Sequence, residues 1–210
     1  MYIEIYVVLI FNIMEWIKTK NNVHRHVVIR KMGVNMDINL RKLSLEDKKE
    51  YWNSGFKNQD EEVMYYTGTT NNPTEEQVCN YIDRVVKDDS REDYVICDSN
   101  NNILGEAVLM EIDDDNKSCH FRIAIFNKES FGKGIGYRAT VEILRIAFEK
   151  LKLHRVELEV FDYNLRAKKM YEKVGFKVEG LKRDGIFIDN QYRGVYIMSI
   201  LEDEYRKIFS

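Results

Sequence analysis

The stretch HFRIAIFNKESFGKGIG, residues 120–136, decides the fold. Its first part alternates between apolar side chains and polar or small ones, and this period of two predicts a half-buried strand over residues 119–125. A polar turn follows at 127–130, and glycines then stand at alternate positions, Gly132, Gly134 and Gly136, before a helical pattern. A strand, a glycine loop and a helix aim backbone N–H groups at an anion, so we expect a phosphate or pyrophosphate site.

Two common phosphate-binding motifs do not fit this loop. A Walker loop requires Gly-Lys followed by Ser or Thr, whereas Gly132-Lys133 is followed by Gly134. A dinucleotide-binding fingerprint requires a third glycine at the position of Tyr137. The loop by itself leaves two alternatives open, an anion site of another kind or a glycine-rich turn that binds nothing.

The composition indicates one domain, with room for an appendage, in 210 residues that are 44% hydrophobic. The net charge of −3 does not favour nucleic-acid binding. Cys79, Cys97 and Cys119 are odd in number and widely spaced, so we expect buried free thiols in a reducing cytoplasm. His24 and His26 form a short pair without other ligands, so we expect no metal.

Residues 1–35 differ in character from the rest of the chain. The apolar run at 6–13 is too short for a membrane span and is wrongly flanked for a signal peptide, so no membrane association is expected. Met36 offers a later start. We therefore predict a non-essential N-terminal extension at 1–35 and a domain at 36–210; the alternative is an added helix that packs on the domain or on a partner.

The remaining sequence alternates between strand and helix patterns. Ser44 with Asp47, and Thr74 with Gln77, have the spacing of capping boxes and predict helix starts. The segment 62–68 is predicted as a loop. Further strands are predicted at 38–43, 94–97, 103–112, 154–161, 176–183 and 191–201, and further helices at 136–151 and 164–175.

Four stretches taken together resemble the GNAT superfamily of acetyl-CoA-dependent N-acetyltransferases. They are FRIAIF, the loop FGKGIG, the strand LHRVELEV, and NLRAKKMYEKVGF, which is similar to the family's N-x-x-A-x-x-x-Y-x-x-x-G-F. The closing VEGLKRDGIFIDNQYRGVYIMSIL resembles the branch of ribosomal-protein N-terminal acetyltransferases and spermidine N-acetyltransferases. The resemblance spans about Asp37 to the C-terminus. It implies an α/β (α+β) fold with a mixed, mostly antiparallel central sheet, splayed parallel strands and flanking helices.

The resemblance also implies an acetyl-CoA site and no metal. Backbone groups of the splayed strand pair with pantetheine, the loop amides bind the pyrophosphate, and Asn164 bonds the pantetheine arm or simply caps its helix. Phe131 departs from the Gln or Arg of many members. Arg166 and Lys169 either meet phosphates or are solvated helix charges. The implied cofactor-binding residues are Ile123, Ala124, Ile125, Phe131, Gly132, Lys133, Gly134, Ile135, Gly136, Asn164, Ala167 and Lys169.

Two residues are predicted to carry the chemistry. By the resemblance, Tyr171 lies near the thioester sulfur, where its hydroxyl supplies a proton to the departing thiolate. A backbone N–H near the splayed strands can hold the oxyanion. Glu111 either takes the amine proton, directly or through water, or is an ordinary exposed hairpin residue; both alternatives stay open.

Three functions are weighed from the sequence. The first is an N-acetyltransferase acting on a small-molecule amine or a peptide N-terminus, the second a non-catalytic acyl-CoA-binding module, and the third an unrelated α/β binding protein. Tyr171 and Asn164 favour the first. The spermidine branch has paired glutamates where this chain has Tyr65-Tyr66-Thr67-Gly68, which weakens a polyamine acceptor. We expect a cytoplasmic protein without nucleic-acid or membrane partners, and leave a homo-oligomer open.

Overall fold

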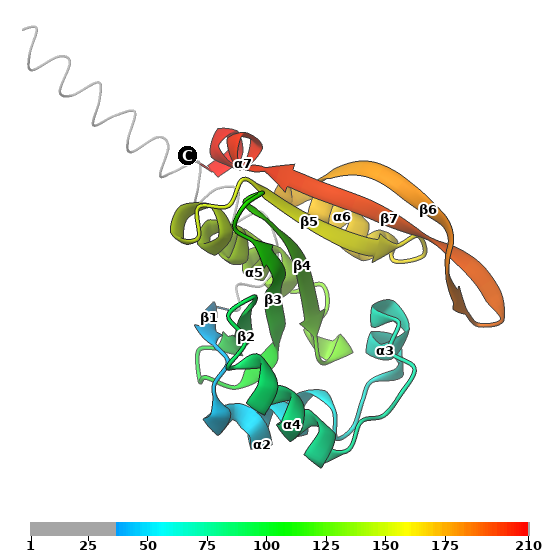
Figure 1. The fold of residues 1–210 in the computed structure, drawn as a ribbon. Helices are drawn as coiled ribbons and strands as arrows, with labels where there is room; N and C mark the ends of the chain where they lie inside the picture. The colour runs from blue at the N-terminus through cyan, green and yellow to red at the C-terminus, as the bar shows by residue number, and fades with distance from the viewer. Residues whose placement is uncertain (1–36, 210) are drawn as a thin grey trace, which may run out of the picture. The chain divides into compact units, whose positions relative to one another are not determined.

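The computed structural model describes residues 37–209 and contains a sheet of seven strands (Figure 1). The predicted extension at 1–35 lies outside the described residues. The strands follow the order β1-β2-β3-β4-β5-β7-β6, and every neighbouring pair is antiparallel except β4 with β5. Their bounds are β1 Ile38–Lys42, β2 Glu92–Asp98, β3 Ile103–Asp113, β4 Ser118–Ile125, β5 Arg155–Phe161, β6 Lys177–Ile188 and β7 Gln191–Leu201.

The helices begin where local hydrogen bonding favours them. Both predicted capping boxes form: the Ser44 N–H donates to Asp47 Oδ2 at 2.8 Å, and the Thr74 N–H donates to Gln77 Oε1 at 2.8 Å. The helices are α2 Lys48–Gly55, α3 Glu61–Thr67, α4 Glu75–Val85, α5 Ile135–Arg145 with a π-helical continuation Ile146–Lys150, α6 Leu165–Val174 and α7 Glu202–Phe209.

Three sequence predictions of secondary structure were wrong. The segment 62–68 is not a loop but part of α3, because Asp60 accepts a hydrogen bond from the Glu62 N–H at 2.9 Å and Gly68 ends the helix at φ 68°. Strand β6 runs five residues further than predicted, since an irregular register between Lys182 and Ile186 disrupts the alternation. Helix α7 was not predicted.

The two faces of the sheet are covered unequally. On one face, α5 and α6 pack on the larger core, which includes Leu109, Phe121 and Leu158. On the other face, α2 and α4 pack on a smaller core around Val95 and Phe126. The smaller core lies toward the β1–β3 side, so within the described residues the second face carries no packed helix core where β4 meets β5.

Strands β4 and β5 separate along their length. Within these strands, parallel pairing covers Ser118 to His120 of β4 and Arg155 to Glu157 of β5. Beyond that point β4 pairs with β3 and β5 pairs with β7, so each strand has a free edge toward the other. The predicted fold class is confirmed, including the splayed parallel strands.

The described residues also bear on the predicted thiols and the membrane. Cys97 and Cys119 are buried free thiols, whereas Cys79 is half-buried. Burial raises the pKa of the Cys119 thiol to about 12, which keeps it protonated and unreactive. Over residues 37–209, no helix is both long enough and apolar enough to cross a membrane. The cytoplasmic location stays a prediction.

Candidate active site

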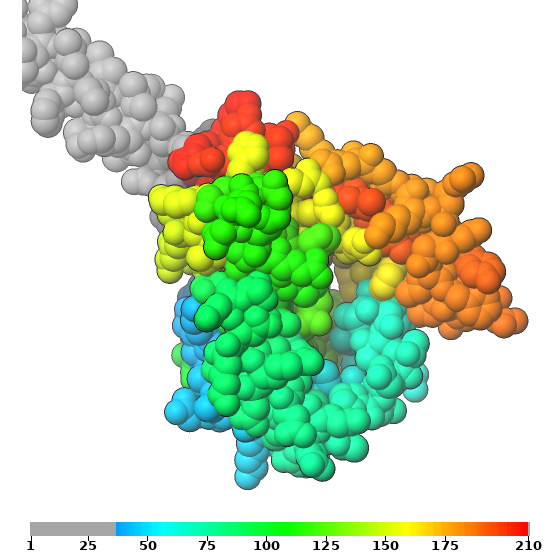
Figure 2. Space-filling model, viewed as in Figure 1, coloured from blue at the N-terminus to red at the C-terminus, as the bar shows by residue number. Residues whose placement is uncertain are grey.

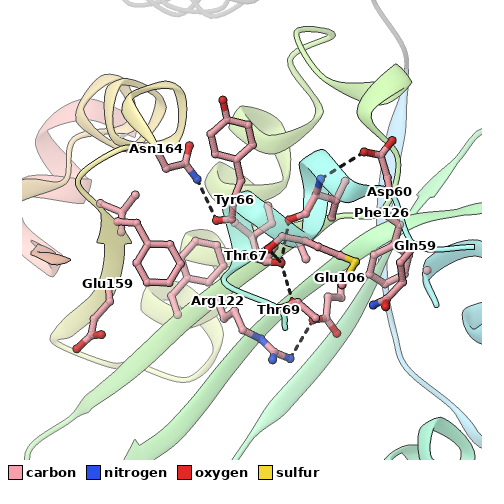
Figure 3. Close-up of a pocket in the computed structure, with 18 of the residues that line it drawn as sticks. Gln59, Asp60, Tyr66, Thr67, Thr69, Glu106, Arg122, Phe126, Glu159 and Asn164 are labelled. Carbon is pink, nitrogen blue, oxygen red and sulfur yellow. Dashed lines mark hydrogen bonds and ion pairs between the residues drawn. The ribbon is translucent and has the colours of Figure 1, made fainter. Parts of the chain in front are cut away.

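A cavity of about 630 Å³ lies on the sheet face where β4 and β5 separate, with α3 at its rim. Figure 2 shows the surface hollowed between α3 and the sheet. Four carboxylates, from β3, β5 and the start of α3, and several aromatic rings line this cavity (Figure 3). They are Asp60, Glu106, Glu111 and Glu159, with Phe56, Tyr66, Phe121, Phe126 and Phe161. The wall is thus apolar with negative charge at several points.

The backbone of β4 offers hydrogen-bonding groups to the gap. The Phe126 N–H donates to Leu104 O on β3 at 2.9 Å, and because directions alternate along a strand, the odd-numbered residues face away from β3. The peptide groups of Ile123 and Ile125 therefore point into the gap. Those of Ala124 point toward β3, and Ala124 itself lines the cavity.

The glycine loop has the geometry of an anion-binding turn. Gly132 and Gly134 adopt φ values of 73° and 76°, which side chains rarely tolerate, and Gly134 is the N-cap of α5. Among residues 37–209, no backbone carbonyl accepts a hydrogen bond from the N–H groups of residues 132–134. The first-turn N–H groups of α5 follow them. The Ile135 side chain is buried, so Ile135 can present only its N–H.

Phe131 and Arg166 join the loop to α6 and α3. The Arg166 guanidinium lies 3.8 Å from the centre of the Phe131 ring and 4.8 Å from that of Tyr66, and its Nη1 is 3.7 Å from Glu62 Oε1. The Arg166 side chain is 46% exposed, and both roles left open for it stay predictions. Lys169 is exposed on α6.

Asn164 serves two elements at once. Its Oδ1 accepts a hydrogen bond from the Ala167 N–H at 3.1 Å, which caps α6, and its Nδ2 donates to Tyr66 O at 3.3 Å (Figure 3). The Tyr163 hydroxyl donates to Tyr65 O at 3.0 Å beside it. Asn164 therefore caps its helix, ties α3 to it, and lines the cavity.

Tyr171 lies in the core between α6 and β4. Its ring meets Phe121 edge-on at 6.4 Å and Phe176 at 5.7 Å between centres, and the residue is 6% exposed. Burial raises the pKa of the phenol above its usual value, so the hydroxyl stays protonated. Phe121 also lines the cavity, so Tyr171 lies directly behind the cavity wall.

Glu111 belongs to a cluster that the sequence did not reveal. A β-bulge between Met110 and Asp113 gives Glu111 a φ of 53°, and its Oε2 lies 3.8 Å from His120 Nε2. Glu157 Oε1 lies 3.4 Å from the same nitrogen. Alternation along β4 places His120 on the polar face, which was the available signal. Over residues 37–209, no group of three or more side chains is arranged to hold a metal ion.

The comparisons with known proteins identify the family. The acetyltransferase (GNAT) domain family matches residues 37–177, which is more than half of the chain. The chain belongs to the GNAT acetyltransferases. The predicted resemblance is confirmed, and so is the predicted enzyme class, an acetyl-CoA-dependent N-acetyltransferase.

Two relatives of this GNAT chain are informative. The spermidine N(1)-acetyltransferase of Vibrio cholerae is 32% identical over 120 residues, 57% of this chain and 69% of that protein. Its crystal structure with CoA and spermine has a TM-score of 0.73 at 28% identity, covering 80% of this chain and 98% of the other. The same enzyme has a dodecameric structure, with a TM-score of 0.69 at 25% identity over 82% and 98%. A ribosomal N-acetyltransferase-like protein of Bacillus subtilis is 30% identical over 103 residues, 49% of this chain and 56% of that protein.

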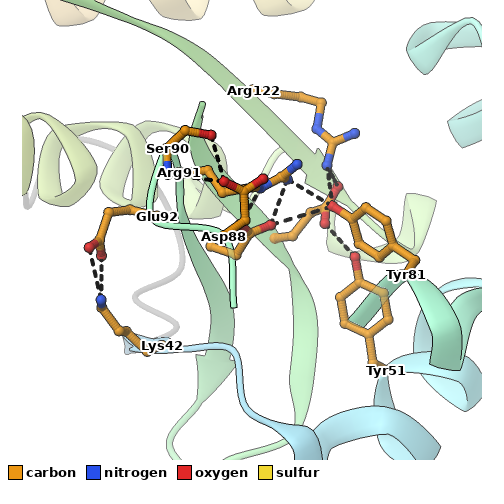
Figure 4. A network of polar contacts seen from close by, with 10 residues as sticks. Lys42, Tyr51, Tyr81, Asp88, Ser90, Arg91, Glu92 and Arg122 are labelled. Carbon is orange, nitrogen blue, oxygen red and sulfur yellow. Dashed lines mark hydrogen bonds and ion pairs between the residues drawn. The ribbon is translucent and has the colours of Figure 1, made fainter. Parts of the chain in front are cut away.

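In this GNAT domain a network of polar contacts includes Glu106 and Arg122, which line the cavity (Figure 4). Tyr51 donates a hydrogen bond to Glu106 Oε2, and Arg122 Nη2 lies 2.9 Å from Glu106 Oε1. The Arg122 Nη2 also donates to the Tyr81 hydroxyl at 3.3 Å. Burial and the nearby Glu106 raise the pKa of the Tyr51 phenol, so Tyr51 remains a donor. Sequence reasoning missed Glu106 and Arg122, because no local motif joins them.

Proposed function

We propose that this GNAT acetyltransferase transfers the acetyl group of acetyl-CoA to a primary amine, on a small molecule or a peptide N-terminus, by direct attack with Tyr171 as general acid. The observation that carries this proposal is the gap between β4 and β5. It lies between the acid-lined cavity on one face and the glycine loop and α6 on the other. Donor and acceptor can therefore meet in the gap from opposite faces.

The residues present fit acetyl-CoA. The free edge of β4 supplies the peptide groups of Ile123 and Ile125, and the loop at 131–136 supplies N–H groups without backbone acceptors among the described residues. When bound, acetyl-CoA supplies the thioester that the amine attacks. Asn164 and Ala167 stay in the proposed site at the start of α6, and Lys133 and Lys169 remain proposed phosphate partners. The expected absence of a metal cofactor stays a prediction.

Tyr171 is the proposed donor of the proton that the departing thiolate needs. Its raised pKa keeps the proton on the hydroxyl at neutral pH, and its position behind Phe121 puts it beside the gap. Glu111, at the bulge of β3, is the proposed residue through which the amine proton leaves. The backbone N–H groups of β4 that face the gap are the proposed donors to the developing negative charge on the acetyl oxygen.

The acceptor is proposed to be cationic before it reacts. Four carboxylates line the cavity against one arginine, Arg122, which Glu106 neutralises. The likeness to spermidine N-acetyltransferases favours a polyamine. The stretch Tyr65-Tyr66-Thr67-Gly68, which lacks the paired glutamates of that branch, favours another amine. An acetyl-CoA-dependent thiol-release screen against polyamines, amino acids, aminoglycosides and peptides beginning with Ala, Ser or Met decides between them.

Cofactor binding is tested separately from turnover. Replacing Gly134 by valine puts a β-branched residue at φ 76° and should weaken CoA binding by at least about tenfold, from backbone strain of roughly 1–3 kcal/mol. Gly180→Val is the control, because Gly180 has no positive φ and no atom within 4 Å of an added Cβ. Calorimetric titration measures both. Wild type that binds no CoA contradicts the site, and wild type that binds CoA but acetylates no amine supports the non-catalytic module.

A homo-oligomer is also proposed. The dodecameric structure of the Vibrio cholerae relative supports it. In this chain β6 is the last strand of the described sheet and is exposed along most of its length, with Leu181 and Phe187 in water. Light scattering behind size-exclusion chromatography measures the mass, and a monomer at micromolar concentration contradicts the proposal.

A further inference from the structure

We infer that His120 takes the proton of the acceptor amine, with Glu157 positioning its imidazole and Glu111 carrying the proton on to solvent. The inference rests on the proposed function and adds the step that makes the amine nucleophilic. It is drawn from the place of His120 in the sheet, its two carboxylate neighbours, and its exposure to the cavity.

His120 stands at the point where the strands part. It is the last residue of β4 that pairs with β5, opposite Glu157, and the free edge of β4 begins at the next residue. The imidazole lines the cavity, and 38% of its surface is exposed. A base at this point lies beside the place where an amine from the cavity would meet a thioester held along β4.

The two carboxylates approach the same ring nitrogen. Glu157 Oε1 lies 3.4 Å and Glu111 Oε2 lies 3.8 Å from His120 Nε2. Carboxylates beside Nε2 favour the tautomer that carries its proton on Nε2, which leaves Nδ1 free to accept another proton. Glu157 is itself held by Arg155, so its carboxylate is fixed on β5.

Exposure distinguishes the roles of these groups. The Glu111 side chain is 76% exposed, whereas 24% of Glu157 is exposed. Glu111 is therefore accessible to water and can release a proton to it, whereas the less exposed His120 can take the proton from the amine. The charged groups nearest the imidazole are Glu111 from β3 and Glu157 from β5, with Arg155 beyond Glu157 and Arg122 two residues along β4 paired to Glu106.

The protons balance in this arrangement. An ammonium N–H bond breaks as the proton moves to His120 Nδ1, and the freed nitrogen lone pair forms the C–N bond while the C–S bond breaks. Tyr171 protonates the departing thiolate. The second proton of the amine, lost as the amide forms, restores Tyr171 through water. A proton leaves His120 from Nε2 by way of Glu111, and exchange with water returns the ring to its Nε2–H tautomer, so one proton is released for each acetyl group transferred.

The test uses His120→Ala in the full chain, with His154→Ala as the matched control. His154 is exposed and does not line the cavity. On an acceptor found by the screen, His120→Ala should lower kcat by about 10²-fold, the scale of a positioned base, and leave CoA binding by calorimetry unchanged. Imidazole added to the buffer should restore part of the rate of His120→Ala and leave wild type and His154→Ala unaffected. Glu157→Gln should lower kcat less and keep CoA binding.

The outcomes separate the two proposals. Wild type that acetylates no amine overturns the proposed function and this inference with it. Active wild type with a His120→Ala variant of equal kcat, at a pH where chemistry limits the rate, overturns the inference alone. A slow His120→Ala variant that imidazole does not restore also overturns it, whether or not CoA binding survives. A slow variant with normal CoA binding and recovery in imidazole supports it.

Discussion

At the scale of single residues, the buried Tyr171 phenol is the proposed general acid. Tyr171→Phe keeps the ring contacts with Phe121 and Phe176 and removes only the hydroxyl. The fold and the affinity for acetyl-CoA should barely change, while kcat should fall by about 10²-fold or more, because the proton is needed only as the thiolate leaves. Steady-state kinetics on a confirmed acceptor measure this. An unchanged kcat, with chemistry rate-limiting, would make Tyr171 a core aromatic and leave water as the acid.

A second single residue, Tyr51, supports the cavity wall. It is 1% exposed and donates a hydrogen bond to Glu106. Tyr51→Phe should lower the free energy of unfolding by about 2 kcal/mol, since a buried carboxylate loses a donor while the packing is kept. Urea denaturation measures it. Tyr192→Phe, at a residue 66% exposed, should change the free energy by less than about 0.5 kcal/mol. Equal stability of the two variants would contradict the role of Tyr51.

At the scale of elements, the sequence predicted those whose cause is local. The capping boxes of Ser44 and Thr74, the alternation of β4 and the glycine loop before α5 each depend on a few neighbouring residues. Helix α3 was missed although Asp60 caps it and Gly68 ends it, because none of its residues is buried and no apolar periodicity marks it. The contact of Glu111 with His120 needs a bulge, and that of His120 with Glu157 needs a parallel pair whose partners lie 37 residues apart in the sequence. No local sequence pattern predicts either of these two contacts.

An ion pair links the edge strand β6 to β5. Arg155 of β5 donates to Glu179 of β6 at 2.7 Å, and the Ser199 hydroxyl of β7 donates to Glu179 at 2.7 Å. Hydrogen bonds from Arg155, then from Ser199, lower the pKa of Glu179 to about 2. Because the folded pKa lies below the ordinary value of 4.5, this stabilisation is complete above pH 4.5 and is lost as the pH falls toward 2.

Glu179→Gln should therefore cost stability at neutral pH and little at low pH. The Glu179 side chain is 42% exposed, so the expected cost at pH 7 is only about 0.2–1 kcal/mol. Urea unfolding at pH 7, 4 and 2.5 measures the difference between variant and wild type. Asp89→Asn is the control, because Asp89 is an exposed carboxyl in a turn. A difference for Glu179→Gln that is constant over this pH range would contradict the ion pair.

At the scale of the whole molecule, the domain that the structure describes contains the parts that are proposed to carry acetyl transfer. Residues 37–209 include the split sheet, the glycine loop, α6 and both hydrophobic cores. Strand β1, beginning at Ile38, is the first edge of this sheet and pairs with β2 alone. The GNAT family match also begins at residue 37. The described sheet, the described cores and the proposed site are therefore formed by residues that follow Met36.

A chain that starts at Met36 should accordingly fold, bind CoA and transfer acetyl groups as the full chain does. The physical reason is that the paired strands and both described cores are made by residues after Met36. Soluble yield, thermal unfolding and CoA titration should match those of the full chain, with Tm within a few degrees and kcat within about twofold, the changes expected when no core contact is lost. Loss of soluble protein, with the full chain well behaved, would show that residues 1–35 cover part of the core or a subunit interface. Normal folding with lost turnover would show instead that they act at the site.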